Sequence, residues 1–331
     1  MINATLVVGP SGSGKTGLIE AWRQRAPTDP PWAVLRDGAP VQLPTGSSEH
    51  PVDDQQPREG LWRPRPRNTI RDDQPAWLER FSACLCCTGR AVLPQGLVRL
   101  MRRGRWAHLL IELNGGGDPA AFIDLLRGPS LVGMIRLTEV VAVFDERRCE
   151  SLDVHEASGR LDYWAASADR VCMRTVADLP SPALTRVWAQ WASIREFDCR
   201  VDVWSPRTVP SLPATDPEAN HSVLDTSESG HWRWRAPPVQ VFDRRRLEKQ
   251  LEAIGRAGTV SILRAAFRTE RDWYAWRGVG AEETSDAWQP TRHRTASRIE
   301  WRVNAASACG SEADGARQIA QALEACQLGA A

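Results

Sequence analysis

Short apolar runs alternate with amphipathic segments over the first 204 residues of this 331-residue chain. The apolar runs are of the kind found in buried strands, and they predict strands at 4–8, 32–35, 107–112, 139–144 and 170–173. The segments between them predict helices at 15–25, 93–103, 119–126 and 182–194. Strands that alternate with helices are typical of α/β proteins, so we expect a doubly wound, mainly parallel sheet.

Two shifts in composition divide the chain. Residues 37–75 are dense in Pro, Arg, Asp and Gln and poor in apolar residues, which predicts an insertion that buries no core. Pro, Ser, Thr and Asp dominate again after residue 204, and we assign 205–236 to an interdomain linker. The expected domains are therefore 1–204, which includes the insertion, and 237–331.

The region 237–331 predicts a smaller α+β domain. Asp243 can cap a helix whose apolar residues Leu247, Leu251 and Ile254 fall on one face. Around this helix, the pattern predicts four strands and a closing helix, at 239–241, 259–267, 273–279, 297–303 and 313–325.

A glycine-rich loop joins the first predicted strand to the first predicted helix. Residues 9–16 read Gly-Pro-Ser-Gly-Ser-Gly-Lys-Thr, the complete pattern of a phosphate-binding loop (P-loop) in the strand-loop-helix setting that it requires. We expect Lys15 to reach the β and γ phosphates and the Thr16 hydroxyl to ligate Mg²⁺. The backbone N–H groups converge on phosphate oxygens. The residues expected to bind nucleotide here are Gly9, Gly12, Ser13, Gly14, Lys15 and Thr16.

Three cysteines form a second candidate site. Cys84, Cys86 and Cys87 lie within four residues, and their thiolates can meet one soft or borderline metal ion. Three ligands leave a coordination position open, which suits a metal ion that is transferred or sensed. A buried trio of free cysteines or a redox pair is the alternative that the spacing leaves open.

An acidic residue follows the third predicted strand. Glu112 ends this apolar run and is followed by Leu-Asn-Gly-Gly-Gly. In a P-loop enzyme, an acid at the end of a neighbouring strand holds Mg²⁺ directly or through water and can orient the attacking water. The glycines after it, beginning with Gly115, let a backbone N–H approach the γ-phosphate, so this loop could sense hydrolysis.

Composition excludes several classes of partner. The formal net charge is +1, so no bulk field recruits nucleic acid or an acidic membrane. The N-terminus carries no signal peptide pattern, and no apolar stretch is long enough to span a bilayer. We therefore expect a cytoplasmic protein with reduced cysteines and with neither nucleic acid nor a membrane as a partner.

Together, the motifs at 9–16, 84–87 and 112–115 resemble those of the CobW family of P-loop GTPases, relatives of UreG and HypB. The family carries Gly-x-x-x-x-Gly-Lys-Thr, Cys-x-Cys-Cys and Glu-x-x-Gly in this order. Three later segments look like the CobW C-terminal domain, at 243–247, 262–265 and 288–290. The resemblance implies nucleotide-gated handling of a transition metal, commonly Zn²⁺ or Co²⁺, for a client metalloprotein.

The chain departs from this family at two places. The family's guanine motif, Asn-Lys-x-Asp, is absent, and only Asp178 remains as a candidate partner for the base, with Arg174 able to stack on it. GTP is the expected nucleotide, and ATP stays open. After the second strand, Arg36 and Asp37 stand where the family has an acidic Asn-Glu-Phe-Gly segment.

These features favour a metal-binding nucleoside triphosphatase that acts as a metallochaperone. In this interpretation Lys15, Glu112 and Gly115 are catalytic, and the loop after Glu112 couples the cysteines to the γ-phosphate. The main alternative is a non-catalytic module that binds nucleotide or metal through a degenerate guanine site. A kinase-like enzyme on the same loop would leave the cysteines unexplained.

Overall fold

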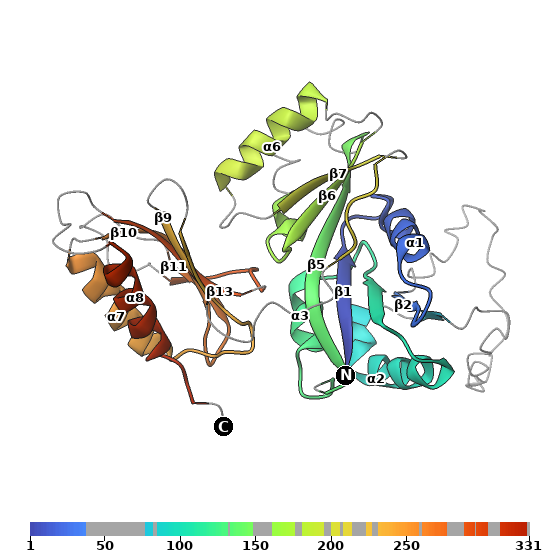
Figure 1. Ribbon diagram of the computed structural model, residues 1–331, viewed down its shortest axis with the longest axis horizontal. Helices are drawn as coiled ribbons and strands as arrows, with labels where there is room; N and C mark the ends of the chain where they lie inside the picture. Colours follow the sequence, from blue (N-terminus) through green and yellow to red (C-terminus); the bar gives the residue numbers. More distant parts are fainter. Residues whose placement is uncertain are drawn as a thin grey trace, which may run out of the picture.

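The computed structural model describes most of the chain. The described residues are 1–37, 77–81, 85–131, 133–147, 161–175, 181–194, 200–205, 208–213, 223–226, 231–257, 260–276, 288–294, 296–303 and 312–329. They form a seven-stranded sheet and a six-stranded sheet, each with its own helices (Figure 1).

The first sheet is parallel throughout and has the order β3-β2-β4-β1-β5-β6-β7. Its strands are β1 (Ile2–Val8), β2 (Trp32–Arg36), β3 (Leu78–Arg80), β4 (His108–Glu112), β5 (Ile135–Asp145), β6 (Arg170–Arg174) and β7 (Arg200–Trp204). Its labelled helices are α1 (Lys15–Arg25), α2 (Leu85–Arg103), α3 (Pro119–Leu126) and α6 (Pro182–Ile194). A parallel sheet with helices on its faces confirms the predicted α/β P-loop fold.

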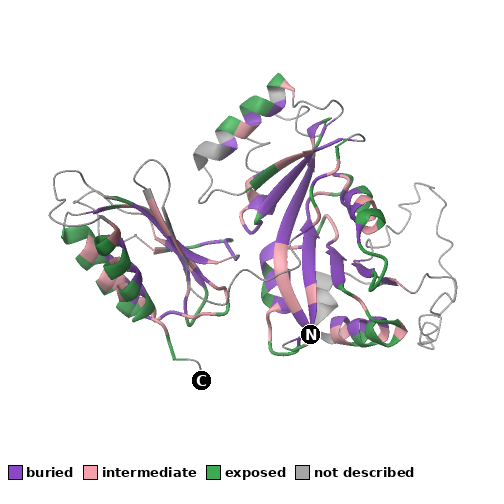
Figure 2. Ribbon diagram, in the orientation of Figure 1, coloured by how far each residue is buried: buried purple, intermediate pink, exposed green. Residues whose placement is uncertain are grey.

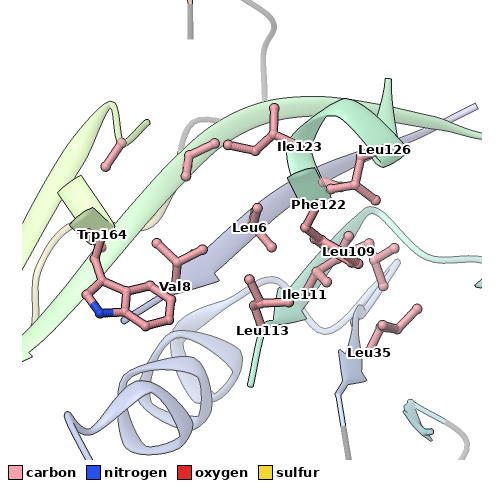
Figure 3. Packing of buried hydrophobic residues seen from close by; sticks show 14 of the residues in the cluster. Leu6, Val8, Leu35, Leu109, Ile111, Leu113, Phe122, Ile123, Leu126 and Trp164 are labelled. Carbon is pink, nitrogen blue, oxygen red and sulfur yellow. The ribbon is translucent and has the colours of Figure 1, made fainter. Parts of the chain in front are cut away.

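Helices cover both faces of this sheet. On one face, Leu6 and Val8 of β1 belong to a buried cluster with Phe122 and Ile123 of α3 (Figure 3). On the other face, Val7 of β1 packs in a second cluster with residues of α1. Burial on both faces explains why the strands are continuous apolar runs instead of alternating patterns (Figure 2).

Helix α2 differs from the prediction at its start. It begins at Leu85, whereas the sequence predicts a start at residue 93, and it includes Pro94. Proline lacks an N–H and is favoured in a first helical turn, so the pattern indicates a start beside it. In the fold, Leu93 and Leu97, which flank Pro94, are both buried in the core. The helix continues through the proline.

The second sheet is antiparallel and has the order β12-β11-β10-β13-β9-β8. Its strands are β8 (Val223–Thr226), β9 (His231–Ala236), β10 (Val260–Arg268), β11 (Trp273–Trp276), β12 (Trp288–Pro290) and β13 (Ser297–Val303). Helices α7 (Arg244–Arg256) and α8 (Glu312–Glu324) contact each other beside it. Asp243 caps α7 by accepting a hydrogen bond from the N–H of Arg246, as expected.

Two expectations for this region need correction. The range 205–236, expected to be a linker, contributes β8 and β9 to the second sheet. Strand β9 alternates tryptophan with arginine, and this period of two buries Trp234 against the helices. The strand expected at 239–241 is not formed, and only Phe242 makes isolated bridges, to Thr269 and Gln327.

A loop of the second domain reaches the first. Between β12 and β13, Arg294 pairs with Asp124 of α3 at 3.0 Å, and Arg292 lies 3.4 Å from Asp118. Asp118 is the N-cap of α3, and its carboxylate accepts the N–H of Ala120. The contact therefore ends on the helix that follows the loop after Glu112.

Candidate nucleotide site

The P-loop depends on glycines for its backbone path. Gly9, Gly12 and Gly14 have φ angles of 138°, 75° and 98°, which other residues rarely adopt. A Cβ at Gly9 would lie 2.2 Å from the carbonyl oxygen of Val143 in β5, so the loop is also pressed against the sheet. Helix α1 then begins at Lys15 without a side-chain cap, and its first N–H groups are arranged to receive an anion.

Two side chains of the loop have the chemistry of phosphate ligands. Lys15 is 6% exposed, and its Nζ donates hydrogen bonds of 2.8 Å to the carbonyl oxygens of Gly9 and Pro10, so the ammonium group lies across the loop. The Ser13 hydroxyl is fully buried and has no hydrogen-bond partner among the described residues. A buried polar atom of this kind carries a desolvation cost, which a phosphate oxygen would relieve.

Strand order brings Glu112 to the loop. In the sheet β4 lies beside β1, with Glu112 opposite Val7. Oε1 of Glu112 accepts a hydrogen bond of 2.5 Å from the Thr16 hydroxyl. That hydroxyl has one proton to donate and lone pairs to spare, so Thr16 can bind Glu112 and still offer oxygen to Mg²⁺. The donor set of one hydroxyl and one carboxylate fits the hard cation that accompanies nucleotides.

The loop after Glu112 lies directly against the P-loop. A Cβ at Gly115 would meet the backbone nitrogen of Ser11 at 2.2 Å, so only glycine allows this approach. Within the loop, the N–H of Gly116 donates to the Asn114 side chain. The N–H of Asn114 donates to Asp37, which follows β2, at 3.2 Å. The two loops and the end of β2 therefore form one connected set.

The carboxyl ends of β6 and β7 close the other side of the P-loop. A Cβ at Gly14 would lie 2.7 Å from the Trp204 ring and 3.0 Å from Cδ of Arg174. The Arg174 guanidinium is 5.5 Å from the centroid of that ring and 3.4 Å from Asp145. Asp178, the expected base ligand, lies outside the described residues.

Trp204 is a residue that sequence reasoning missed. Its place at the end of an apolar strand was the available signal, but the chain has 15 tryptophans, and only strand order distinguishes this one.

The cysteine site stays a prediction. Cys84 lies outside the described residues, and Cys86 and Cys87 fall at the beginning of α2, where the placement of side chains is not described. Within the described ranges, no group of three His, Cys, Asp or Glu side chains could hold a metal ion. In the described part of the chain, strand β3 lies parallel to β2, so the carboxyl ends of the two strands adjoin. There the N–H of Phe81 donates to the carbonyl oxygen of Arg36. In the sequence, the cysteines come after β3 and Phe81.

Comparison with known proteins finds a match to one protein family. Residues 65–194 match the family described as CobW/HypB/UreG, nucleotide-binding domain, over less than half of the chain. This match confirms the resemblance that the motifs predict. The zinc chaperone YeiR of Escherichia coli (strain K12) is 25% identical over 253 residues, which cover 71% of this chain and 70% of that relative.

Two solved structures also align with the chain. They are the zinc-bound YjiA GTPase from E. coli, with a TM-score of 0.40, and a zinc-bound triple mutant of YjiA GTPase, with a TM-score of 0.38. Each is 14% identical, and each alignment covers 99% of this chain and 99% of the other. In the described part of the chain, no helix is both long and apolar enough to cross a membrane.

Proposed function

We propose that this chain, which matches the CobW/HypB/UreG nucleotide-binding domain over residues 65–194, is a metal-binding nucleoside triphosphatase that acts as a metallochaperone. The expected nucleotide is GTP, and the expected cargo is zinc, cobalt or a similar transition metal for a client metalloprotein. The observation that carries the proposal is the hydrogen bond between Thr16 and Glu112 beside Lys15. It joins a phosphate loop to the acid that hydrolysis requires.

Each residue of the site has a role in hydrolysis. Lys15, the Ser13 hydroxyl and the N–H groups at the start of α1 bind the phosphates and orient the γ-phosphate. Thr16 and Glu112 would hold Mg²⁺, which neutralises charge that develops on the phosphates. Glu112 also orients the attacking water. Gly115 brings a backbone N–H toward the γ-phosphate because its loop touches the P-loop.

The transition metal is proposed to bind at Cys84, Cys86 and Cys87. Their thiolates suit zinc or cobalt. The name of the YeiR relative, a zinc chaperone, supports zinc. The cysteine segment follows the same sheet edge as Asp37 and the loop after Glu112, so γ-phosphate contacts and metal affinity can influence each other.

A non-catalytic binding module is the alternative function. Its motivation is the base side of the site, where the chain lacks the Asn-Lys pair of the family and Arg174 and Trp204 pack beside Gly14. Asp178 remains the proposed partner for guanine, and ATP stays open as a substrate. The cytoplasmic location and the expectation of no nucleic-acid or membrane partner also remain predictions.

Steady-state hydrolysis of GTP and ATP with Mg²⁺ separates these functions. The informative variants are Lys15→Ala and Glu112→Gln, each expected to lose about 100-fold or more of the wild-type rate, because each removes charge stabilisation or water orientation. Lys249→Ala is the matched control, since Lys249 is the only other lysine and lies exposed on α7. Wild-type protein that hydrolyses neither nucleotide, with and without Zn²⁺, would favour the binding module.

A zinc titration tests the coupling. Affinity for Zn²⁺ is measured with GDP and with a non-hydrolysable GTP analogue, in wild type and in a Cys86→Ser/Cys87→Ser variant. We expect the two nucleotides to change zinc affinity by about fivefold or more in wild type, a typical allosteric coupling. Equal affinities would contradict the coupling, and unchanged zinc binding by the variant would contradict the cysteine site.

A further inference from the structure

Arg36 binds the acid that the proposed mechanism uses. It is the last residue of β2 and lies opposite Glu112 in the register of β2 and β4. Its Nε donates a hydrogen bond of 2.6 Å to Oε2 of Glu112, while Oε1 accepts from Thr16. The side chains of Arg36 and Glu112 are 22% and 10% exposed, so the pair is largely shielded from solvent. Both oxygens of the carboxylate are therefore held.

The charges around this pair make Arg36 the main counterion of Glu112. Among the described residues, no other cation forms an ion pair with Glu112. Lys15 donates to backbone carbonyl oxygens of its own loop. Two further acids are near Arg36. The carboxylate of Asp37, the next residue, accepts the N–H of Asn114. The pKa of Glu20 in α1 is lowered chiefly by its hydrogen bond from Arg23.

Two consequences follow from this geometry. A guanidinium that touches Glu112 reduces the attraction of this carboxylate for a second cation, because the two positive charges repel each other at short range. The same hydrogen bond also fixes the direction of the carboxylate, because the planar guanidinium donates along defined directions. Weaker attraction for Mg²⁺ is thus combined with a better oriented acid.

We propose that Arg36 is a positioning residue that orients Glu112 and sets the Mg²⁺ concentration the site requires. The proposal rests on the proposed function only in that Thr16 and Glu112 receive the Mg²⁺ of a bound nucleotide. It assigns a role to an arginine that stands where the related family carries an acidic segment. Arg36 acts through Glu112 and not by contact with the phosphates.

The test is the Mg²⁺ dependence of nucleotide binding in Arg36→Gln and Arg36→Lys. Affinity for a fluorescent GTP analogue and for its ATP counterpart is measured over a range of Mg²⁺ concentrations. Arg36→Gln should lower the half-saturating Mg²⁺ concentration by roughly tenfold, because the carboxylate loses its competing cation. At saturating Mg²⁺, its kcat should fall by about tenfold or more, because the acid loses its orientation.

Arg36→Lys is the conservative variant. It keeps the positive charge and loses the planar donor, so its Mg²⁺ requirement should stay within about twofold of wild type while kcat still falls. A merely structural role for Arg36 would not lower the Mg²⁺ requirement. Arg23→Gln is the matched control, since Arg23 pairs with Glu20 on α1 and makes no ion pair with Glu112.

Several outcomes would overturn the proposal. One is an unchanged or higher Mg²⁺ requirement in Arg36→Gln. If the glutamine variant does not fold, an unchanged kcat in Arg36→Lys would overturn the positioning role instead. Another is a loss of nucleotide affinity at saturating Mg²⁺, which would make Arg36 a phosphate ligand. Wild-type binding that does not depend on Mg²⁺ would overturn it as well. Failure of hydrolysis with Mg²⁺-dependent binding intact contradicts the proposed function alone, since the binding measurement still decides the role of Arg36.

Discussion

At the scale of single residues, close backbone contacts constrain the site as much as its charged groups do. Gly115 belongs to the loop after Glu112 and lies against Ser11 of the P-loop. A methyl group there would meet a backbone nitrogen at 2.2 Å, which no side-chain rotation can relieve. The sequence predicts a role for this glycine in sensing the γ-phosphate, and the packing of the two loops gives a physical reason.

We expect Gly115→Ala to reduce nucleotide hydrolysis by about tenfold or more, because the two loops must separate and the N–H groups move away from the phosphate. Hydrolysis at saturating nucleotide and thermal unfolding are the measurements. Gly116→Ala is the control, because its added methyl group would meet nothing nearer than Asn114 Oδ1 at 3.7 Å. Equal rates in both variants would show that the contact with Ser11 has no catalytic consequence.

At the scale of elements, the sequence predicts where most strands and helices lie along the chain, but it does not predict which elements pack side by side. Residues buried on both faces of a parallel sheet form apolar runs that are readable without the fold, so the strands of the first sheet up to β6 are predicted, apart from β3. Strands β8 and β9 are missed because the composition around them is that of a linker. Tertiary packing likewise carries α2 through Pro94.

The same limit applies to the site. Lys15, Thr16 and Glu112 are readable because each belongs to a motif with a fixed setting. The pairing of Arg36 with Glu112 depends on β2 lying beside β4, and the contact of Trp204 with Gly14 depends on where β7 lies. Strand order is not encoded in local patterns, so neither contact could be predicted from them.

The ends of β6 and β7 give a prediction about the base. Arg174 presents a flat cation over Trp204 beside Gly14, and stacking on such a group is tolerant of base identity. We expect Arg174→Ala to weaken binding of GTP and ATP alike, by about fivefold. Arg200→Ala is the control, because Arg200 lies at the opposite end of β7. A loss confined to GTP, measured by calorimetry, would instead assign Arg174 to guanine selection.

At the scale of the whole molecule, charged residues of both signs lie where the two domains meet. Asp169, just before β6, accepts a hydrogen bond of 2.9 Å from the N–H of Val140 and interacts electrostatically with Arg298 of β13 and Arg127 after α3. Burial lowers the pKa of each of these arginines to about 10. Charges from both domains thus lie close together, and they interact across the interface.

Arg294 is the side chain of this interface with the clearest partners on both sides. It is 9% exposed, donates to Asp124 of the first domain at 3.0 Å and to Asp272 of its own domain at 3.2 Å. Its neighbour Arg292 reaches Asp118, the cap of the helix after the Glu112 loop. The contact between domains is therefore continuous with the loop proposed to sense the γ-phosphate.

We expect Arg294→Ala to weaken the contact between domains by about 1 kcal/mol, because it removes an arginine whose two carboxylate partners are half exposed to solvent. Small-angle X-ray scattering should then give a larger radius of gyration, and limited proteolysis should cut faster between the domains. Arg317→Ala is the matched control, since among the described residues Arg317 pairs only with Asp314 of its own helix α8 and is 62% exposed. An unchanged radius in Arg294→Ala would mean that the two domains are held together without this arginine.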